Sequence, residues 1–242
     1  MITSEDAFGN GLYDYFIGES VHEVIERDDG YIVVWNGPGA YFAEFDDWQP
    51  AEREAMNFAF GKVLDIGCGA GRHALYLQHT GLKAMGIDVS PLALEVCEQR
   101  GLVNTRECPI TEVNSNLGKF DTIITMGNNF GLLANPRRAR WLLRRFYSMT
   151  SQNGRLIAAS NDPYKTDDED HLAYHTRNRQ RGRMSGQIRI RVRYRGIKDK
   201  WFDYLMVSKA EMEDILIGTG WQVREYIDSG NAQYIAVIEK HT

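Results

Sequence analysis

Three glycines with alternate spacing follow a short apolar segment that contains a carboxylate. The segment covers residues 63–66 and includes Asp65, and Gly67, Gly69 and Gly71 come directly after it. Glycine permits a tight turn and lets a ligand approach the backbone. A helix that begins after such a turn directs its free N–H groups toward an anionic ligand group. These residues predict a site for a small charged ligand.

A second carboxylate, Asp88, closes the next apolar segment. At the end of a strand beside a glycine-rich turn, an acidic side chain can accept hydrogen bonds from both hydroxyls of a ribose. The glycine spacing restricts the nucleotide. A dinucleotide fingerprint requires G-x-G-x-x-G, and its third glycine would fall on Arg72. The observed spacing is G-x-G-x-G, which disfavours NAD and hydride chemistry.

On these residues the sequence resembles the class I S-adenosylmethionine-dependent methyltransferases. The first motif of that family corresponds to residues 65–71 and its second, acidic motif to residues 86–90, and the similarity covers residues 55–160. The resemblance implies that the cofactor is S-adenosylmethionine. It also implies that the three glycines and Cys68 line the methionine end of the cofactor.

The same resemblance assigns the remaining cofactor contacts. Asp65 would contact the amino group of the cofactor, Asp88 would bind its ribose, and Val89 would pack on its adenine. The family often has an acidic residue near adenine after the third strand, where this chain has Cys108, Pro109 and Ile110. We therefore expect backbone and apolar contacts to the adenine there.

The segment after the strand at residues 120–125 is the expected substrate side, because ligands bind outside the carboxyl ends of strands in such sheets. Met126 would pack against the cofactor, and Asn128 would either orient the acceptor or satisfy the loop backbone. By the resemblance, Tyr13 and Tyr15 would form part of an aromatic lid over the cofactor, or else pack in the core. A tyrosine face would favour a sulfonium.

Arginines recur between residues 177 and 195. They alternate with apolar residues over 188–195, as in a half-buried strand. This arginine stripe is consistent with recognition of phosphate or carboxylate, or with local binding of RNA. It is also consistent with an edge strand protected by exposed charge, which is the interpretation we favour.

Several elements must position these residues. Apolar segments at 63–66, 84–88, 120–125 and 155–159 alternate with helical patterns at 70–79, 91–100 and beyond 135, which predicts a parallel sheet covered by helices on both faces. Residues 31–35 and 41–45 predict a hairpin around an Asn-Gly-Pro-Gly turn, and residues 188–194 and 201–207 predict a second hairpin. A helix over 209–217 and two last strands, 221–226 and 234–238, would add antiparallel edges.

The expected fold is therefore α/β, with a doubly wound, mostly parallel seven-stranded sheet of the Rossmann-like methyltransferase type. Antiparallel C-terminal edge strands and an inserted β-hairpin complete it. We expect residues 1–60 to form a cap or lid segment and residues 61–242 to form the cofactor-binding domain. Within that domain, residues 165–207 are expected to be an insertion on the substrate side.

Composition narrows the function classes. The chain has 242 residues and a formal net charge of -5, so no global basic field favours nucleic acid or anionic membrane. No apolar run has the length that a bilayer span requires. The three cysteines form no C-x-x-C pair, which predicts reduced thiols, no metal site and a cytoplasmic protein.

The expected function is methyl transfer from S-adenosylmethionine to a small-molecule acceptor by in-line displacement. One alternative is a methyltransferase that acts on RNA or protein through the arginine stripe. Another is a non-catalytic nucleotide-binding α/β protein. The sequence does not name the acceptor, the methylated atom or the oligomeric state.

Overall fold

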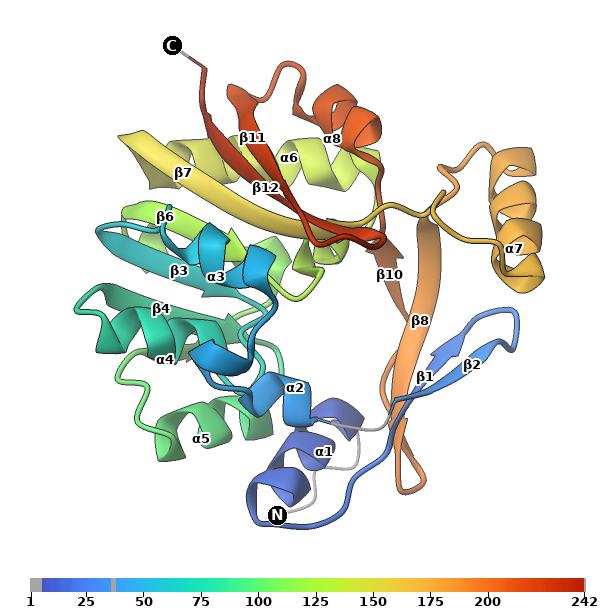
Figure 1. Cartoon of the computed structure of the whole chain (residues 1–242), viewed down its shortest axis with the longest axis horizontal. Helices are drawn as coiled ribbons and strands as arrows, with labels where there is room; N and C mark the ends of the chain where they lie inside the picture. Colours follow the sequence, from blue (N-terminus) through green and yellow to red (C-terminus); the bar gives the residue numbers. More distant parts are fainter. Residues whose placement is uncertain (1–5, 36–37, 242) are drawn as a thin grey trace.

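Seven strands form a large sheet in the order β11-β12-β7-β6-β3-β4-β5 (Figure 1). The computed structural model describes residues 6–35 and 38–241. The strands are β3 (Lys62–Ile66), β4 (Lys83–Asp88), β5 (Thr105–Glu107), β6 (Phe120–Thr125), β7 (Thr150–Asn161), β11 (Trp221–Asp228) and β12 (Gln233–Lys240). Strands β3 to β7 pair in parallel, while β12 and β11 pair antiparallel. The predicted sheet and its antiparallel C-terminal edge are confirmed.

Helices cover both faces of the large sheet. On one face lie α3 (Pro50–Met56), α4 (Arg72–His79) and α5 (Pro91–Gln99), and on the other lie α6 (Pro136–Met149) and α8 (Lys209–Leu216). Neighbouring strand residues point to opposite faces: Val63 packs with the first group of helices and Leu64 with the second. Because both faces are buried, the central strands β3 and β6 are mainly apolar and do not alternate with polar residues.

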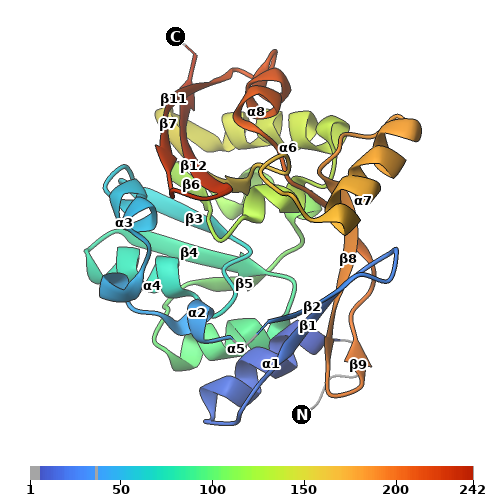
Figure 2. The ribbon, with the colours of Figure 1, turned by 45° about the vertical axis from the view of Figure 1, so that its right-hand side comes forward.

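A small second sheet stands beside the large one (Figures 1 and 2). It has the order β10-β8-β1-β2, with β9 also paired to β8. Its strands are β1 (Glu23–Arg27), β2 (Ile32–Trp35), β8 (Gln187–Tyr194), β9 (Ile197–Lys198) and β10 (Phe202–Leu205). The expected segments 1–60 and 165–207 thus supply strands to one shared sheet. The predicted pairing of the strands at 188–194 and 201–207 is confirmed.

Short helices complete the fold. The first is α1 (Ala7–Phe16), which packs on α5, and the second is α2 (Gly39–Phe42). The 3-10 helices are η1 (Phe45–Asp47), η2 (Ile110–Glu112), η3 (Ser115–Leu117) and η4 (Asn129–Leu133). In the described ranges, no helix combines the length and apolar character needed to cross a membrane.

The predicted hairpin of residues 31–35 and 41–45 is wrong. Strand β2 pairs with β1 instead, and the segment around Tyr41 is helical. The turn of the observed hairpin connects β1 to β2. In it the N–H of Gly30 donates to the carbonyl of Arg27 at 2.9 Å, and Gly30 has φ +92°. Pro38, with φ −59°, starts helix α2 rather than ending a hairpin turn.

Three further boundaries differ from the prediction. Helix α4 begins at Arg72, because residues 69–71 still belong to the glycine turn. The strand predicted at residues 155–159 is longer, because residues 150–154 already belong to β7. Helix α7 (Glu169–Gln180) was not predicted. Its side chains are mostly polar, so apolar periodicity does not reveal it, and the cap that starts it is Asp168, which accepts from the N–H groups of residues 170 and 171.

Candidate active site

The glycine turn joins β3 to α4 at the carboxyl edge of the large sheet. Gly67, Gly69 and Gly71 all have positive φ, at +70°, +55° and +80°. A side chain at Gly67 would also collide with Asn129, because its Cβ would lie 2.7 Å from the Nδ2 atom. Only glycine adopts this path without strain. Gly71 is the N-cap of α4 and has no side chain to cap it, so the first N–H groups of the helix lie at the turn.

Asp65 lies beneath this turn and is 2% exposed. Its carboxylate faces the backbone N–H of Ala74 in α4, while its Oδ2 atom has no hydrogen-bond partner among the described residues. Burial, followed by the nearby charge of Asp88, raises the pKa of Asp65 to about 7. A buried carboxylate oxygen without a partner is costly. It is satisfied if a ligand donates a hydrogen bond to it.

Asp88 ends β4 directly beside the turn. Its carboxylate accepts from the N–H of Gly69 at 3.0 Å, of Val89 at 2.7 Å and of Ser90 at 3.1 Å. Burial raises its pKa, and these three donors oppose the rise. The backbone therefore fixes the orientation of the Asp88 carboxylate. A fixed orientation is what binding of a rigid ligand requires.

Apolar surface flanks Asp88 where an adenine was predicted. Val89 is 62% exposed although it is apolar. Strand β5 brings Cys108 alongside, because the Cys108 N–H donates to the Asp88 carbonyl at 2.9 Å. Pro109 and Ile110 follow at the same edge and are half-buried. The structure thus brings together the predicted adenine residues.

Two of the predicted cofactor residues point into the core instead. Met126 is 2% exposed and packs in the cluster that includes Ile124 and Ile235. The Cys68 thiol lies behind the turn, with its Sγ 3.9 Å from that of Cys97. The side chains of Met126 and Cys68 therefore contribute to core packing.

Asn129, and not Asn128, makes the side-chain contact to the loop backbone that was one alternative predicted for Asn128. Asn129 satisfies the loop backbone, because its Nδ2 donates to the carbonyl of Gly67 at 2.8 Å. Asn128 has φ +68°, and its buried Oδ1 has no partner in the described part of the chain. Its carbonyl accepts from the hydroxyl of Tyr204, on β10, at 2.6 Å. The small sheet is thereby tied to the substrate-side loop.

Two aromatic rings, Phe8 and Tyr41, cover the glycine turn. A Cβ on Gly69 would lie 3.6 Å from Phe8 Cζ and 3.7 Å from Tyr41 Cδ1, and the two rings meet edge to face. Sequence reasoning missed both, because no local pattern distinguishes them. Tyr15, predicted as a lid residue, packs instead on Phe42 of α2 and is 37% exposed.

The small sheet has an inner face that looks toward the carboxyl edge of the large sheet. Strand pairing places the following side chains on it: Glu23, Ile25, Arg27, Val33, Ile188, Ile190, Val192 and Tyr204. Between this face, α7 and the end of β7 is a cavity of about 260 Å³, which we call the chamber. Its lining is mainly apolar and includes Ile25, Val33, Ile188, Ile190, His175 and Met206.

The arginine stripe of β8 lies on the opposite, outer face. Arg191 contacts Glu26 at 2.8 Å, Arg193 contacts Glu26 at 3.3 Å and Arg189 contacts Asp203 at 3.3 Å. These arginines already have carboxylate partners and face away from the glycine turn. The geometry therefore favours a charged outer face over an anion-recognition site.

Comparison with known proteins shows a similarity to methyltransferases. Residues 63–154 match the family model described as a methyltransferase domain. A glycine/sarcosine N-methyltransferase from Parasynechococcus marenigrum is 28% identical over 150 residues, which are 60% of this chain and 51% of that protein. A glycine/sarcosine/dimethylglycine N-methyltransferase from Actinopolyspora halophila is 32% identical over 169 residues, 63% of this chain and 28% of that protein. Over these residues the chain is similar to S-adenosylmethionine-dependent methyltransferases.

Solved structures agree with this family fold. A methyltransferase from Bacteroides fragilis, crystallised with S-adenosyl-L-homocysteine, has a TM-score of 0.84 at 24% identity and covers 100% of this chain and 98% of its own. The CcbJ methyltransferase from Streptomyces caelestis has a TM-score of 0.65 at 15% identity over 99% of this chain and 100% of its own. At these identities the likeness shows the methyltransferase fold. The chain spans about half the length, or less, of the curated relatives given above.

Proposed function

We propose that this protein transfers a methyl group from S-adenosylmethionine to a small-molecule acceptor. When bound, the cofactor supplies a methyl group already activated on a sulfonium sulfur. The protein then has to hold donor and acceptor in line, and positioning of this kind contributes about 7–11 kcal/mol toward lowering a barrier. A site for such chemistry needs shape and orientation more than dedicated acids and bases.

The observation that carries the proposal is the unpaired Oδ2 atom of Asp65 beneath the glycine turn. The amino group of the cofactor would donate to it, and this would relieve the cost of burying a bare carboxylate. Asp88 would hold the ribose, and the exposed surface of Val89 would receive the adenine. The aromatic rings of Phe8 and Tyr41 lie over the turn, where they would face a sulfonium favourably. The residues present fit the cofactor.

Two observations support a small acceptor rather than RNA or protein. The chamber lies at the same sheet edge as the glycine turn, and its volume of about 260 Å³ is close to the lower end of the roughly 300–1,000 Å³ of small-ligand pockets. The arginines of β8 that would recognise phosphate are paired with carboxylates on the outer face. Relatives named as glycine/sarcosine and quinolone methyltransferases act on small molecules, which agrees with this choice.

The test is calorimetric titration with S-adenosylmethionine, S-adenosylhomocysteine and NAD. We expect the two sulfur nucleosides to bind and NAD not to bind. Asp88→Ala should weaken binding by roughly 10- to 100-fold, because hydrogen bonds to a charged group contribute about 1.5–3 kcal/mol. Asp203→Ala, which removes a carboxylate from the outer face, is the control and should bind normally.

The outcomes separate the competing functions. Binding of NAD alone would overturn the methyltransferase assignment. Binding of the sulfur nucleosides without release of S-adenosylhomocysteine, on incubation with a broad acceptor library, would favour a non-catalytic protein. A complex with RNA that weakens steeply with salt, and is lost in Arg191→Ala, would restore the arginine-stripe alternative.

A further inference from the structure

Glu23 is a buried carboxylate near the glycine turn. None of the proposed cofactor contacts involves it. It lies on the inner face of the small sheet and is 6% exposed. The hydroxyl of Tyr41 donates a hydrogen bond to it, and the ring of Tyr41 packs over Gly69. Tyr41 thus links Glu23 to the glycine turn through a single side chain.

No cation compensates Glu23 within the described ranges. The ion pairs found there include no Lys, Arg or His within 4 Å of its carboxylate, and the charge that acts on its pKa is that of a second carboxylate, Asp199. The guanidinium of Arg72, whose charge acts on the Tyr41 hydroxyl, is paired with Glu52 at 2.5 Å. Burial and Asp199 raise the pKa of Glu23 to about 7. An isolated buried carboxylate is unfavourable unless a ligand or a proton neutralises it.

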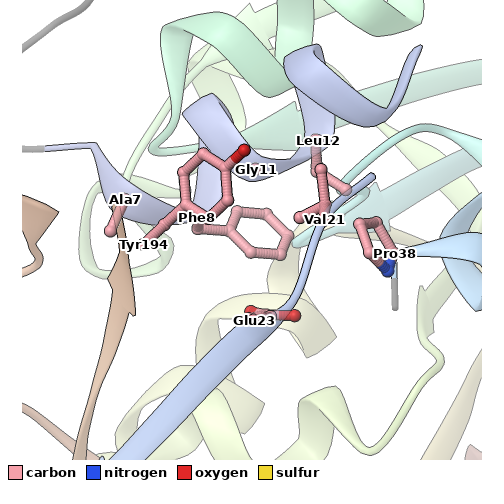
Figure 3. Close-up of a pocket in the computed structure, with 8 residues that line it drawn as sticks. All are labelled: Ala7, Phe8, Gly11, Leu12, Val21, Glu23, Pro38 and Tyr194. Atoms are coloured by element: carbon pink, nitrogen blue, oxygen red, sulfur yellow. The ribbon is translucent and has the colours of Figure 1, made fainter. Parts of the chain in front are cut away.

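Aromatic rings surround this carboxylate. Glu23 lines a small cavity together with Phe8, Val21, Pro38 and Tyr194, and Figure 3 shows the ring of Phe8 in the middle of this group. With Tyr41 as a hydrogen-bond partner, three aromatic side chains lie near one negative charge. A carboxylate among aromatic faces favours a cation, because the ring quadrupole and the charge act in the same direction.

The same strand face continues into the chamber. Ile25 follows Glu23 two residues later and lines the chamber with Val33, Ile188 and Ile190. Two residues of a strand span about 6.8 Å. A molecule whose charged end meets Glu23 therefore has an apolar wall within reach of its body.

We propose that Glu23 and Tyr41 recognise the methyl acceptor, and that the acceptor is an amine with an apolar body that extends along Ile25 into the chamber. This inference rests on the proposed methyltransferase function, since it names the substrate class of that site. An ammonium group supplies the missing positive charge and donates to the carboxylate. An alcohol of the same shape supplies a hydrogen bond without the charge, so the site should discriminate against it.

The experiment compares 2-phenylethylamine with 2-phenylethanol, which share a skeleton and differ in the charged group. Binding is measured by calorimetry on the full chain saturated with S-adenosylhomocysteine. We expect the amine to bind at least tenfold tighter than the alcohol. Glu23→Gln should weaken amine binding by roughly 10- to 100-fold and change alcohol binding less than twofold.

Glu26→Gln is the matched control, because Glu26 lies on the same strand but on the outer face, where it pairs with Arg191. It should keep the preference for the amine. Equal binding of both probes, binding of neither, or an unchanged amine affinity in Glu23→Gln would overturn the assignment. So would a selective loss of affinity for S-adenosylmethionine over S-adenosylhomocysteine in Glu23→Gln, which would assign the carboxylate to the sulfonium.

The probes also separate this inference from the function on which it rests. If S-adenosylhomocysteine does not bind to the wild-type chain, the methyltransferase proposal fails, and the same two probes are titrated into the free protein. A preference for the amine that depends on Glu23 would then still establish an amine site. Its absence, with the nucleoside bound, refutes the acceptor class alone.

Discussion

Gly67 and Gly69 have similar backbone conformations but different surroundings, which allows two causes of destabilisation to be separated. Both are left-handed, with φ +70° and +55°. A Cβ at Gly67 would lie 2.7 Å from Asn129 Nδ2 and 2.8 Å from Leu132 Cδ1. A Cβ at Gly69 would meet its nearest atoms, in Phe8 and Tyr41, only at 3.6 and 3.7 Å.

These distances set the expected magnitudes. An alanine in the left-handed region costs roughly 1–2 kcal/mol in either place. Overpacking adds roughly 1–3 kcal/mol, and it applies only at Gly67, where Asn129 would have to move away from the carbonyls that it binds. We therefore expect Gly67→Ala to lower the free energy of unfolding by about 2–5 kcal/mol and Gly69→Ala to lower it by about 1–2 kcal/mol.

Urea unfolding without cofactor measures both values, and thermal unfolding gives a second estimate at about 2–4 °C per kcal/mol for a chain of this size. For the loss of affinity for S-adenosylhomocysteine, we expect the opposite order of the two variants. The added methyl group of Gly69→Ala lies between the turn and its aromatic cover, so this variant should lose affinity out of proportion to its stability. Equal losses of stability in the two variants would refute the packing argument, and an unchanged affinity in Gly69→Ala would refute the placement of the cofactor.

Three further predictions concern charged residues. The folded chain keeps a proton on Asp65 up to about pH 7, well above its usual pKa of 3.8, so the free energy of unfolding should fall as pH rises from about 4 to about 7. In Asp65→Asn that fall should be smaller, as urea titrations at pH 5 and pH 8 would show; parallel profiles would contradict it. Glu52→Gln leaves the largely buried Arg72 without its carboxylate, and it should cost about 3–5 kcal/mol of stability in urea unfolding. Arg191→Ala breaks an outer-face contact with Glu26, so it should cost about 1 kcal/mol or less and leave binding of S-adenosylhomocysteine unchanged in calorimetry.

The large sheet was predictable because its signals are local. Its buried strands are short apolar runs, and Ser90 and Asn135 each cap a helix and precede a proline, as the structure has them. The glycine turn and Asp88 were predictable for the same reason. Each is defined by residue type and spacing within one strand–turn–helix unit, and parallel pairing of β3 with β4 then brings them together.

The cover and the acceptor side could not be predicted, because they depend on contacts between distant segments. Strand β1 pairs with β8, so Ile25 lies opposite Val192, and no local pattern records that register. From the sequence alone, Glu23 would be taken for an ordinary surface carboxylate. Its burial depends on the pairing of these strands. The arginines of β8 were conspicuous in sequence, yet their partners Glu26 and Asp203 come from β1 and β10. The structure supports the interpretation of the stripe as an exposed charged face because it shows these partners, which the sequence alone does not identify.

Helix α1, which carries Phe8 of the aromatic cover, is hydrogen-bonded to the residues that follow β4 beside the glycine turn. Asp6 caps α1 by accepting from the Gly9 N–H at 2.8 Å, and it also accepts from the Ser90 hydroxyl at 2.7 Å. Ser90 in turn donates its N–H to Asp88 and caps α5. From the other side, Asp199 accepts from the N–H of Ala7 at 2.6 Å. Because α1 is held at once by the end of β4 and by the small sheet, the position of Phe8 over the glycine turn depends on both. The hydrogen bonds that orient Asp88 and those that position the aromatic cover therefore belong to one network.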